Sequence, residues 1–167
     1  MAHRVAQCDS IRFLETQSMS GPAEVAKTEP KTKQVAAIPF RFDNRGELEV
    51  LLVTSRETKR WVIPKGWPWP QLPNYKAAQE EAWEEAGAIG RAIKGKIGSF
   101  AYDKRKGDRS IPVKVLVYLL EVTELARTWP ETGQRKRAWF TPEKAADAVD
   151  EPELKELLRG LDTLVPR

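Results

Sequence analysis

The chain has very few of the side chains on which most nucleophilic and transition-metal sites depend. It contains one cysteine and one histidine in 167 residues, Cys8 and His3, and both lie in the first ten positions. A single cysteine excludes an internal disulfide framework. Beyond those ten positions a Ser-His-Asp or Cys-His arrangement is therefore ruled out, and a zinc site built on Cys and His is not expected. Chemistry in the remainder must use carboxylates and a hard metal ion.

Long hydrophobic runs are absent as well. No apolar stretch approaches the length that spans a bilayer. The N-terminus lacks the apolar core of a secretory signal because Arg4, Asp9, Arg12 and Glu15 interrupt it. We therefore expect a cytoplasmic protein with no membrane partner.

The amino-acid composition is that of a globular protein, with 41% hydrophobic and 31% charged residues and a net charge of +4. This mild positive charge suits an anionic ligand. Segment 16–33 is polar, has two prolines and shows no period, so residues 1–31 are expected to form a disordered tail. Residues 32–167 are long enough for one domain with its own core.

The residues most suggestive of chemistry lie between Trp61 and Gly90. This stretch reads as a short strand, a proline-rich loop opened by Gly66, and a helix rich in carboxylates. Glu81, Glu84 and Glu85 stand at i, i+3 and i+4, so a helix places all three on one face, where they repel unless a cation lies between them. Mg²⁺ takes oxygen ligands and bridges to phosphates. The helix is thus predicted to form a metal-binding phosphate site, with Mn²⁺ as an alternative ion.

This stretch resembles the Nudix signature, which is a glycine, five residues, a glutamate, seven residues, and then Arg-Glu-apolar-x-Glu-Glu-x-Gly-apolar. Two positions depart from it, because Leu72 replaces the first glutamate and Glu80 replaces the arginine. Glutamate-rich helices without flanking glycines are usually solvated faces, and here glycines flank the helix at both ends. The positions that agree with the signature are Gly66, Glu81, Ala82, Glu84, Glu85, Gly87 and Ala88.

Three further segments are similar to the diphosphoinositol polyphosphate phosphohydrolase branch of that family. They are LLVTSRETKRWVIPKG, the turn and strand at 103–122, and GQRKRAWF at 133–140. The resemblance implies Mg²⁺-dependent hydrolysis of a phosphoanhydride bond in an inositol pyrophosphate, a diadenosine polyphosphate or a nucleoside-diphosphate-linked substrate. The branch usually has three glycines where this chain has Lys65, Gly66 and Trp67.

The resemblance also implies roles for individual residues. Glu81, Glu84 and Glu85 are the expected catalytic residues and metal ligands. The general base stays open between one of these three and a separate loop carboxylate. A small polyphosphate would be held mainly by cations. Arg41 and Arg56 end predicted strands near the proline-rich loop, and Arg56 and Lys136 match basic positions of that branch. The expected substrate-binding residues are Arg41, Arg56, Lys65, Gly66 and Lys136.

The expected fold is an α/β, Nudix-type α/β/α sandwich with a mixed sheet. Asn74 is expected to cap the carboxylate helix and Gly87 to end it. Trp67 and Trp69 should be exposed on the proline-rich loop, where they can cover a base or ring or pin the loop, and pinning is favoured. The expected strands are 34–42, 47–54, 61–64, 97–102, 111–122 (buried on both faces) and 135–140, and the later helices are 142–149 and 151–161.

Two other functions remain open. Leu72 and Glu80 favour a non-catalytic Nudix-like module that senses a nucleotide or polyphosphate. The net positive charge favours an RNA-binding or RNA-decapping protein. The chain has no aromatic-and-glycine RNA-binding motif, however, so nucleic acid is not the expected partner. The oligomeric state is left open between monomer and homodimer.

Overall fold

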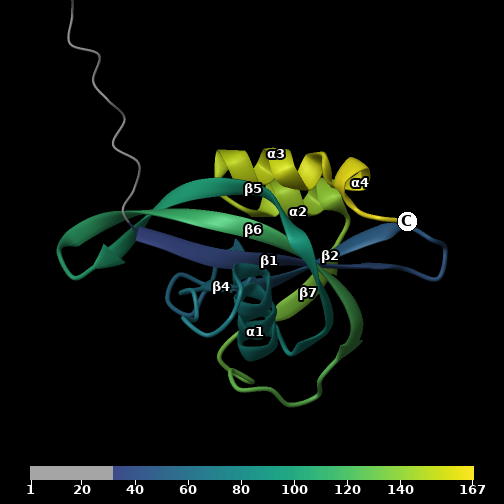
Figure 1. Cartoon of the computed structure of the whole chain (residues 1–167), viewed down its shortest axis with the longest axis horizontal. Coiled ribbons are helices and arrows are strands. Elements are labelled where there is room, and N and C mark those ends of the chain that lie inside the picture. The colour runs from purple at the N-terminus through teal and green to yellow at the C-terminus, as the bar shows by residue number, and fades with distance from the viewer. Residues whose placement is uncertain (1–31) are drawn as a thin grey trace, which may run out of the picture.

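A mixed β-sheet forms the middle layer of the molecule (Figure 1). The computed structural model describes residues 32–167; the predicted tail 1–31, with His3 and Cys8, lies outside the described residues. The main path of the sheet has the order β3-β2-β1-β6-β5, while β4 pairs with β1 and β7 with β2. The strands are β1 (Thr32–Phe42), β2 (Leu48–Thr54), β3 (Trp61–Val62), β4 (Lys65–Gly66), β5 (Ala88–Lys106), β6 (Arg109–Leu125) and β7 (Arg137–Phe140).

Helices cover both faces of this sheet. Helix α1 (Asn74–Ala86) lies on one face, and α2 (Pro142–Ala148), α3 (Pro152–Arg159) and α4 (Leu161–Leu164) lie on the other (Figure 1). Strands β1 and β6 are parallel, whereas the other paired strands are antiparallel. These layers confirm the predicted α/β/α sandwich with a mixed sheet. Within residues 32–167 no helix is long and apolar enough to cross a membrane.

The central strands are buried on both sides, so their alternate side chains enter two separate cores. In β1, Val35 and Ala37 pack toward α1, while Ala36, Ile38 and Phe40 pack toward the other helices. A strand covered on both faces needs a nearly continuous apolar run, which this segment provides. Burial on both faces also fixes the register, because a slip of one residue would exchange the two cores.

Small side chains let α1 approach the sheet closely. Its buried residues are Ala77, Ala78, Ala82, Glu85 and Ala86. Gly87 ends the helix in the left-handed conformation with φ 62°, as predicted. The buried face of α1 therefore carries one carboxylate into the contact with the sheet, next to the alanines.

Several predicted boundaries are wrong. Strand β3 ends at Val62 instead of residue 64, and β7 begins at Arg137 instead of residue 135. Asn74 is the first helical residue of α1, not its cap; Pro73 occupies the cap position, and no side chain caps the helix. Strand β5 begins at Ala88 instead of residue 97, because pairing with β6 overrides a glycine-rich segment and tolerates three register shifts. The last helix divides at Gly160 into α3 and α4.

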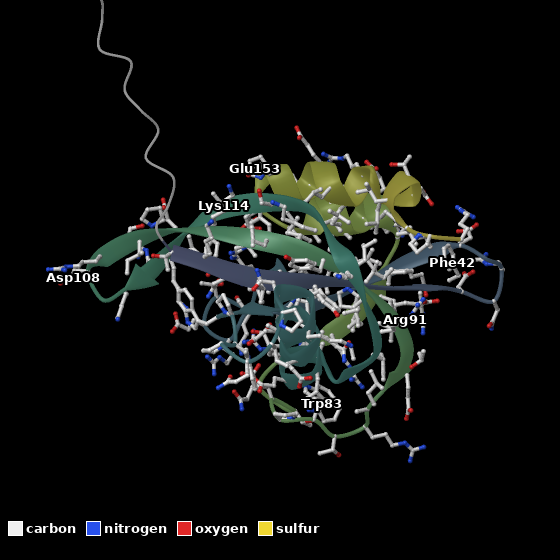
Figure 2. All side chains as sticks on the ribbon, in the orientation of Figure 1. Phe42, Trp83, Arg91, Asp108, Lys114 and Glu153 are labelled. Carbon is white, nitrogen blue, oxygen red and sulfur yellow. The ribbon has the colours of Figure 1, made fainter. Side chains whose placement is uncertain are left out.

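The prediction that 111–122 is buried on both faces holds only for part of the strand. In β6, full burial on consecutive positions is confined to residues 117–120. The β5–β6 hairpin extends beyond the helices, and its tip at Asp108 lies at the opposite end of the sheet from Phe42 (Figure 2). The outer part of the hairpin is mostly exposed and carries the basic residues Lys104, Arg105, Lys106 and Arg109.

Candidate active site

Glu85 is the buried carboxylate of the predicted metal-binding helix. Its Oε2 accepts a hydrogen bond from the backbone N–H of Lys65 at 3.3 Å, and its Oε1 accepts one from Nη2 of Arg135 at 3.1 Å. Burial raises the pKa of Glu85 to about 7, while Arg135 and Lys65 act in the opposite direction. The two donors thus offset only part of the cost of burying the charge, and a further cation near Glu85 would be favourable.

Glu81 lies against the glycine that opens the motif. A Cβ atom added to Gly66 would overlap the Glu81 carboxylate, so the close approach depends on glycine at this position. Burial raises the pKa of Glu81, a side-chain hydrogen bond from Trp69 lowers it, and the neighbouring Glu84 and Glu131 raise it further. Strand β4, which pairs with β1, holds Gly66 in this place.

Glu84 is half-buried on the same helix. Neither Glu81 nor Glu84 forms an ion pair within residues 32–167. The backbone carbonyl of Glu84 accepts a hydrogen bond from the N–H of Glu131 at 3.1 Å. The carboxylates of Glu81 and Glu84 are therefore not neutralised by an ion pair, whereas that of Glu85 is paired with Arg135.

The loop before β7 holds the C-terminal end of α1. Arg137 donates to the carbonyls of Ala86 and Ala126, both at 2.7 Å, and its guanidinium lies 3.9 Å from the centroid of the Trp129 ring. A cation at this end of a helix satisfies carbonyls that lack partners and complements the helix dipole. The Nε1–H of Trp129 donates to the carbonyl of Glu85 at 3.1 Å. The loop thereby fixes the turn of α1 that carries Glu84 and Glu85.

Arg135 is the site residue that the sequence reasoning missed. Its side chain is 8% exposed, and it contacts Glu85 at 3.1 Å and Glu131 at 2.7 Å. It also donates to the carbonyl of Thr54 at 3.1 Å, which joins the helix to strand β2. The run GQRKRAWF contained this arginine, but sequence alone gave no reason to choose it over Lys136.

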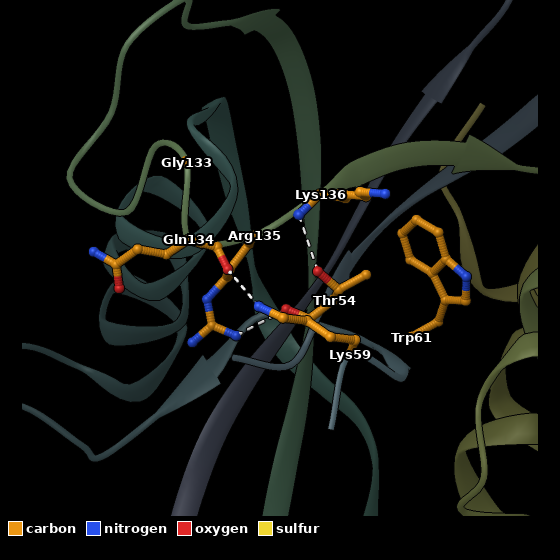
Figure 3. A pocket seen from close by; sticks show the side chains of 7 residues that line it. All are labelled: Thr54, Lys59, Trp61, Gly133, Gln134, Arg135 and Lys136. Atoms are coloured by element: carbon orange, nitrogen blue, oxygen red, sulfur yellow. Dashed lines mark hydrogen bonds between the residues drawn. The ribbon is translucent and has the colours of Figure 1, made fainter. Parts of the chain in front are cut away.

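A cationic cavity of about 560 Å³ opens beside Arg135 (Figure 3). The N–H of Lys136 donates to Oγ1 of Thr54 at 2.9 Å, and Nζ of Lys59 lies 3.4 Å from the carbonyl of Gln134. Three positively charged side chains and no carboxylate line the cavity, which suits an anion. The lining residues are Thr54, Lys59, Trp61, Gly133, Gln134, Arg135 and Lys136.

The structure brings some predicted substrate-binding residues together and separates one. Arg56 pairs with Glu131 at 3.5 Å, which places it close to Arg135. Arg41 instead pairs with Glu49 at 2.7 Å and lies 4.0 Å from the centroid of the Trp139 ring. Arg41 is six residues along β1 from the residue that pairs with Gly66, which is roughly 20 Å of extended strand. Arg41 is therefore not brought to the carboxylates.

Lys65 presents its backbone to the carboxylates and its side chain to another part of the fold. The backbone N–H binds Glu85, whereas Nζ lies 5.2 Å from the centroid of the Tyr102 ring. Desolvation lowers the pKa of Lys65, although Glu85 acts to raise it. The role that this structure supports for Lys65 is to hold Glu85.

The donor chemistry fits a hard divalent ion. Glu81 and Glu84 offer carboxylate oxygens, and the missing side chain of Gly66 is what lets the Glu81 carboxylate lie against the loop that opens the motif. The raised pKa values of Glu81 and Glu85 indicate negative charge that the surrounding protein does not fully offset. Within residues 32–167 no three His, Cys, Asp or Glu side chains already converge as a metal cluster. The carboxylates would have to rotate toward a shared ion.

Comparison with known proteins identifies the family. The family model described as "NUDIX domain" matches residues 31–161. The chain belongs to the Nudix family. This Nudix chain is 36% identical over 118 residues to human diphosphoinositol polyphosphate phosphohydrolase 3-alpha, in a match that covers 68% of the chain and 66% of that protein. It is 32% identical over 140 residues to Nudix hydrolase 17, mitochondrial, of Arabidopsis thaliana, covering 80% of the chain and 73% of that protein.

Solved structures share the fold. A C. elegans Ap4A hydrolase binary complex superimposes with a TM-score of 0.59 at 22% identity, covering 80% of this chain and 96% of that one. The NUDIX domain of Shewanella oneidensis NrtR complexed with ADP ribose gives a TM-score of 0.60 at 12% identity, covering 82% of this chain and 90% of that one. At these identities the likeness establishes the architecture, which is the Nudix-type sandwich expected from the sequence.

Proposed function

We propose that this Nudix protein hydrolyses a phosphoanhydride bond in a small polyphosphate, with Mg²⁺ held by Glu81, Glu84 and Glu85. The substrate classes are inositol pyrophosphates, diadenosine polyphosphates and nucleoside-diphosphate-linked compounds. The name of the human relative supports the first class, and that of the C. elegans Ap4A hydrolase supports the second. A cytoplasmic location and a monomeric or homodimeric state are part of the same proposal.

The contact between Gly66 and Glu81 carries this proposal. A helix that was merely a solvated acidic face would not need glycine opposite one of its carboxylates, nor a buried second carboxylate with a raised pKa. Both features bring negative charge that the protein offsets only in part to the loop that opens the motif. A dication bound between the protein and a phosphate chain would offset that charge.

Some residues of the chain would orient the Glu85 carboxylate, and others would neutralise the phosphates of the substrate. Lys65 and Arg135 hold the Glu85 carboxylate in a fixed orientation from two sides. Lys59 and Lys136, with Arg135, line a cavity in which the non-reacting phosphates can be neutralised. The bound metal ion would supply Lewis acidity and lower the pKa of the attacking water. A carboxylate of the site would accept the proton from that water.

A substrate panel tests the proposal. The full-length protein should release products from at least one substrate class with Mg²⁺ or Mn²⁺ and from none in EDTA. Product identity, orthophosphate or a nucleoside monophosphate plus the remainder, names the bond that is cut. The Glu84→Gln variant should lose at least about 100-fold in kcat, as expected when a metal-ligand contact is removed. Full turnover by Glu84→Gln would refute the assignment of that residue.

A non-catalytic sensor remains the alternative function. Leu72 and Glu80 depart from the signature, and a Nudix domain complexed with ADP ribose is among the structures that share this fold. A sensor would bind a polyphosphate with measurable affinity and release no product from any substrate with either metal. The same panel, accompanied by calorimetry, therefore separates the two functions.

A further inference from the structure

Two tryptophans stand exposed beside the carboxylates. Trp67 is 46% exposed and Trp69 is 39% exposed, and they lie in the single run Trp67-Pro68-Trp69. Exposing one large aromatic side chain is ordinary, but exposing two in three residues leaves a substantial apolar surface in water. Pro68 and Pro70 restrict the backbone on this loop, so the two rings are held with little further loss of chain entropy.

This aromatic surface adjoins the candidate active site. Trp67 directly follows Gly66, whose backbone lies against the Glu81 carboxylate. The side chain of Trp69 lies close enough to Glu81 to lower the pKa of that carboxyl. Trp69 is thus directed at a carboxylate of the site, whereas no hydrogen bond holds the Trp67 ring within residues 32–167.

A cation from a distant part of the chain approaches Trp67. Nζ of Lys104 lies 4.8 Å from the centroid of the Trp67 ring. Lys104 belongs to β5, near the tip of the β5–β6 hairpin, where Arg105, Lys106 and Arg109 add further positive charge. Lys104 lies over one face of a Trp67 ring that is still 46% exposed, and Trp67 follows the glycine that contacts a carboxylate of the site. An exposed ring next to a cation and to carboxylates suited to a metal ion is complementary to a ligand that has a flat ring and a phosphate chain.

We propose that Trp67 is a stacking platform for the nucleobase of a nucleoside polyphosphate, with Lys104 neutralising the adjoining phosphates. This inference rests on the proposed function and narrows its substrate class. A nucleobase has a π face that can stack on an indole, whereas the ring of an inositol pyrophosphate is saturated. Stacking of a base on an aromatic side chain contributes roughly 1–3 kcal/mol, which corresponds to about 5- to 150-fold in affinity.

Equilibrium binding tests this subsite without any turnover. Calorimetry on the full-length protein in EDTA should compare ATP with inorganic tripolyphosphate, which has the same number of phosphates and no base. We expect the wild-type protein to bind ATP at least about fivefold more tightly. Trp67→Ala should abolish that preference, and Trp67→Phe should retain most of it because a flat ring remains.

Phe42→Leu is the matched control, since Phe42 is 36% exposed and lies at the opposite end of the sheet from the hairpin tip (Figure 2). It should keep the wild-type preference. Equal affinities for ATP and tripolyphosphate, no binding of ATP, or a preference that survives Trp67→Ala would each overturn the stacking proposal. Hydrolysis without a Trp67-dependent preference refutes only the subsite, whereas the preference without hydrolysis refutes only the enzyme.

Discussion

Replacing Glu85 with glutamine should remove a pH-dependent loss of stability. Burial raises the pKa of Glu85 from 4.5 to about 7, so the folded state holds this proton to higher pH than the unfolded chain does. The stabilising effect of that proton is complete below pH 4.5 and is lost as the pH rises through 7. At 1.36 kcal/mol per pKa unit, the wild-type protein loses about 3 kcal/mol over this interval because of Glu85.

Urea unfolding at pH 5 and pH 8 in EDTA measures this loss. The free energy of unfolding of Glu85→Gln, relative to that of the wild type, should rise by about 2.5 kcal/mol between the two pH values. Glu84→Gln removes a carboxylate from the next position of the same helix and is the matched control; it keeps Glu85, so the loss of stability that Glu85 causes between the two pH values should remain. Parallel curves for wild type and Glu85→Gln would refute the assignment of a buried, under-compensated carboxyl.

Three further predictions concern the same site. Gly66→Ala should lower kcat at least about tenfold, because its Cβ displaces the Glu81 carboxylate; near-normal turnover of a folded Gly66→Ala protein would contradict this. Arg135→Met should lower the free energy of unfolding by about 3 kcal/mol at pH 8, because it leaves Glu85 buried without its charged partner. Urea denaturation measures this loss, which should be smaller at pH 5, where Glu85 is protonated. Mg²⁺ at 100 times its Kd should raise the free energy of unfolding by about 2.7 kcal/mol, and Glu84→Gln should weaken this effect in thermal melts; a Tm that Mg²⁺ leaves unchanged would exclude the metal site.

Much of the carboxylate site could be predicted because its geometry is local. Helical periodicity places Glu81, Glu84 and Glu85 within one turn of each other wherever the helix lies. Gly87 ends that helix as predicted, since the left-handed conformation there favours glycine. The roles of these carboxylates as metal ligands, and of Arg56 and Lys136 in substrate binding, stay predictions.

Predictions made from neighbouring residues did not anticipate the effects of pairing between distant strands. Strand β5 begins nine residues earlier than predicted, because its glycine-rich first part pairs with β6, and Gly90 allows the close approach to the backbone of Glu121. Arg41 was chosen for its charge and its position near a strand end, but pairing along β1 carries it away from Gly66. Neither outcome can be read from a window of neighbouring residues.

The amino-acid sequence alone determined which chemistry is open to this protein. With His3 and Cys8 confined to the first ten positions, only carboxylates and a hard ion remain, and the spacing of the glutamates places them on one helical face. Only the tertiary structure decided how deeply each of those carboxylates is buried and which residues it contacts. Glu85 is buried against Arg135, which is 50 residues away in the chain, and Glu81 faces Gly66 across a contact that β4 creates. Such differences arise from packing between remote segments, and packing sets the desolvation of each charge.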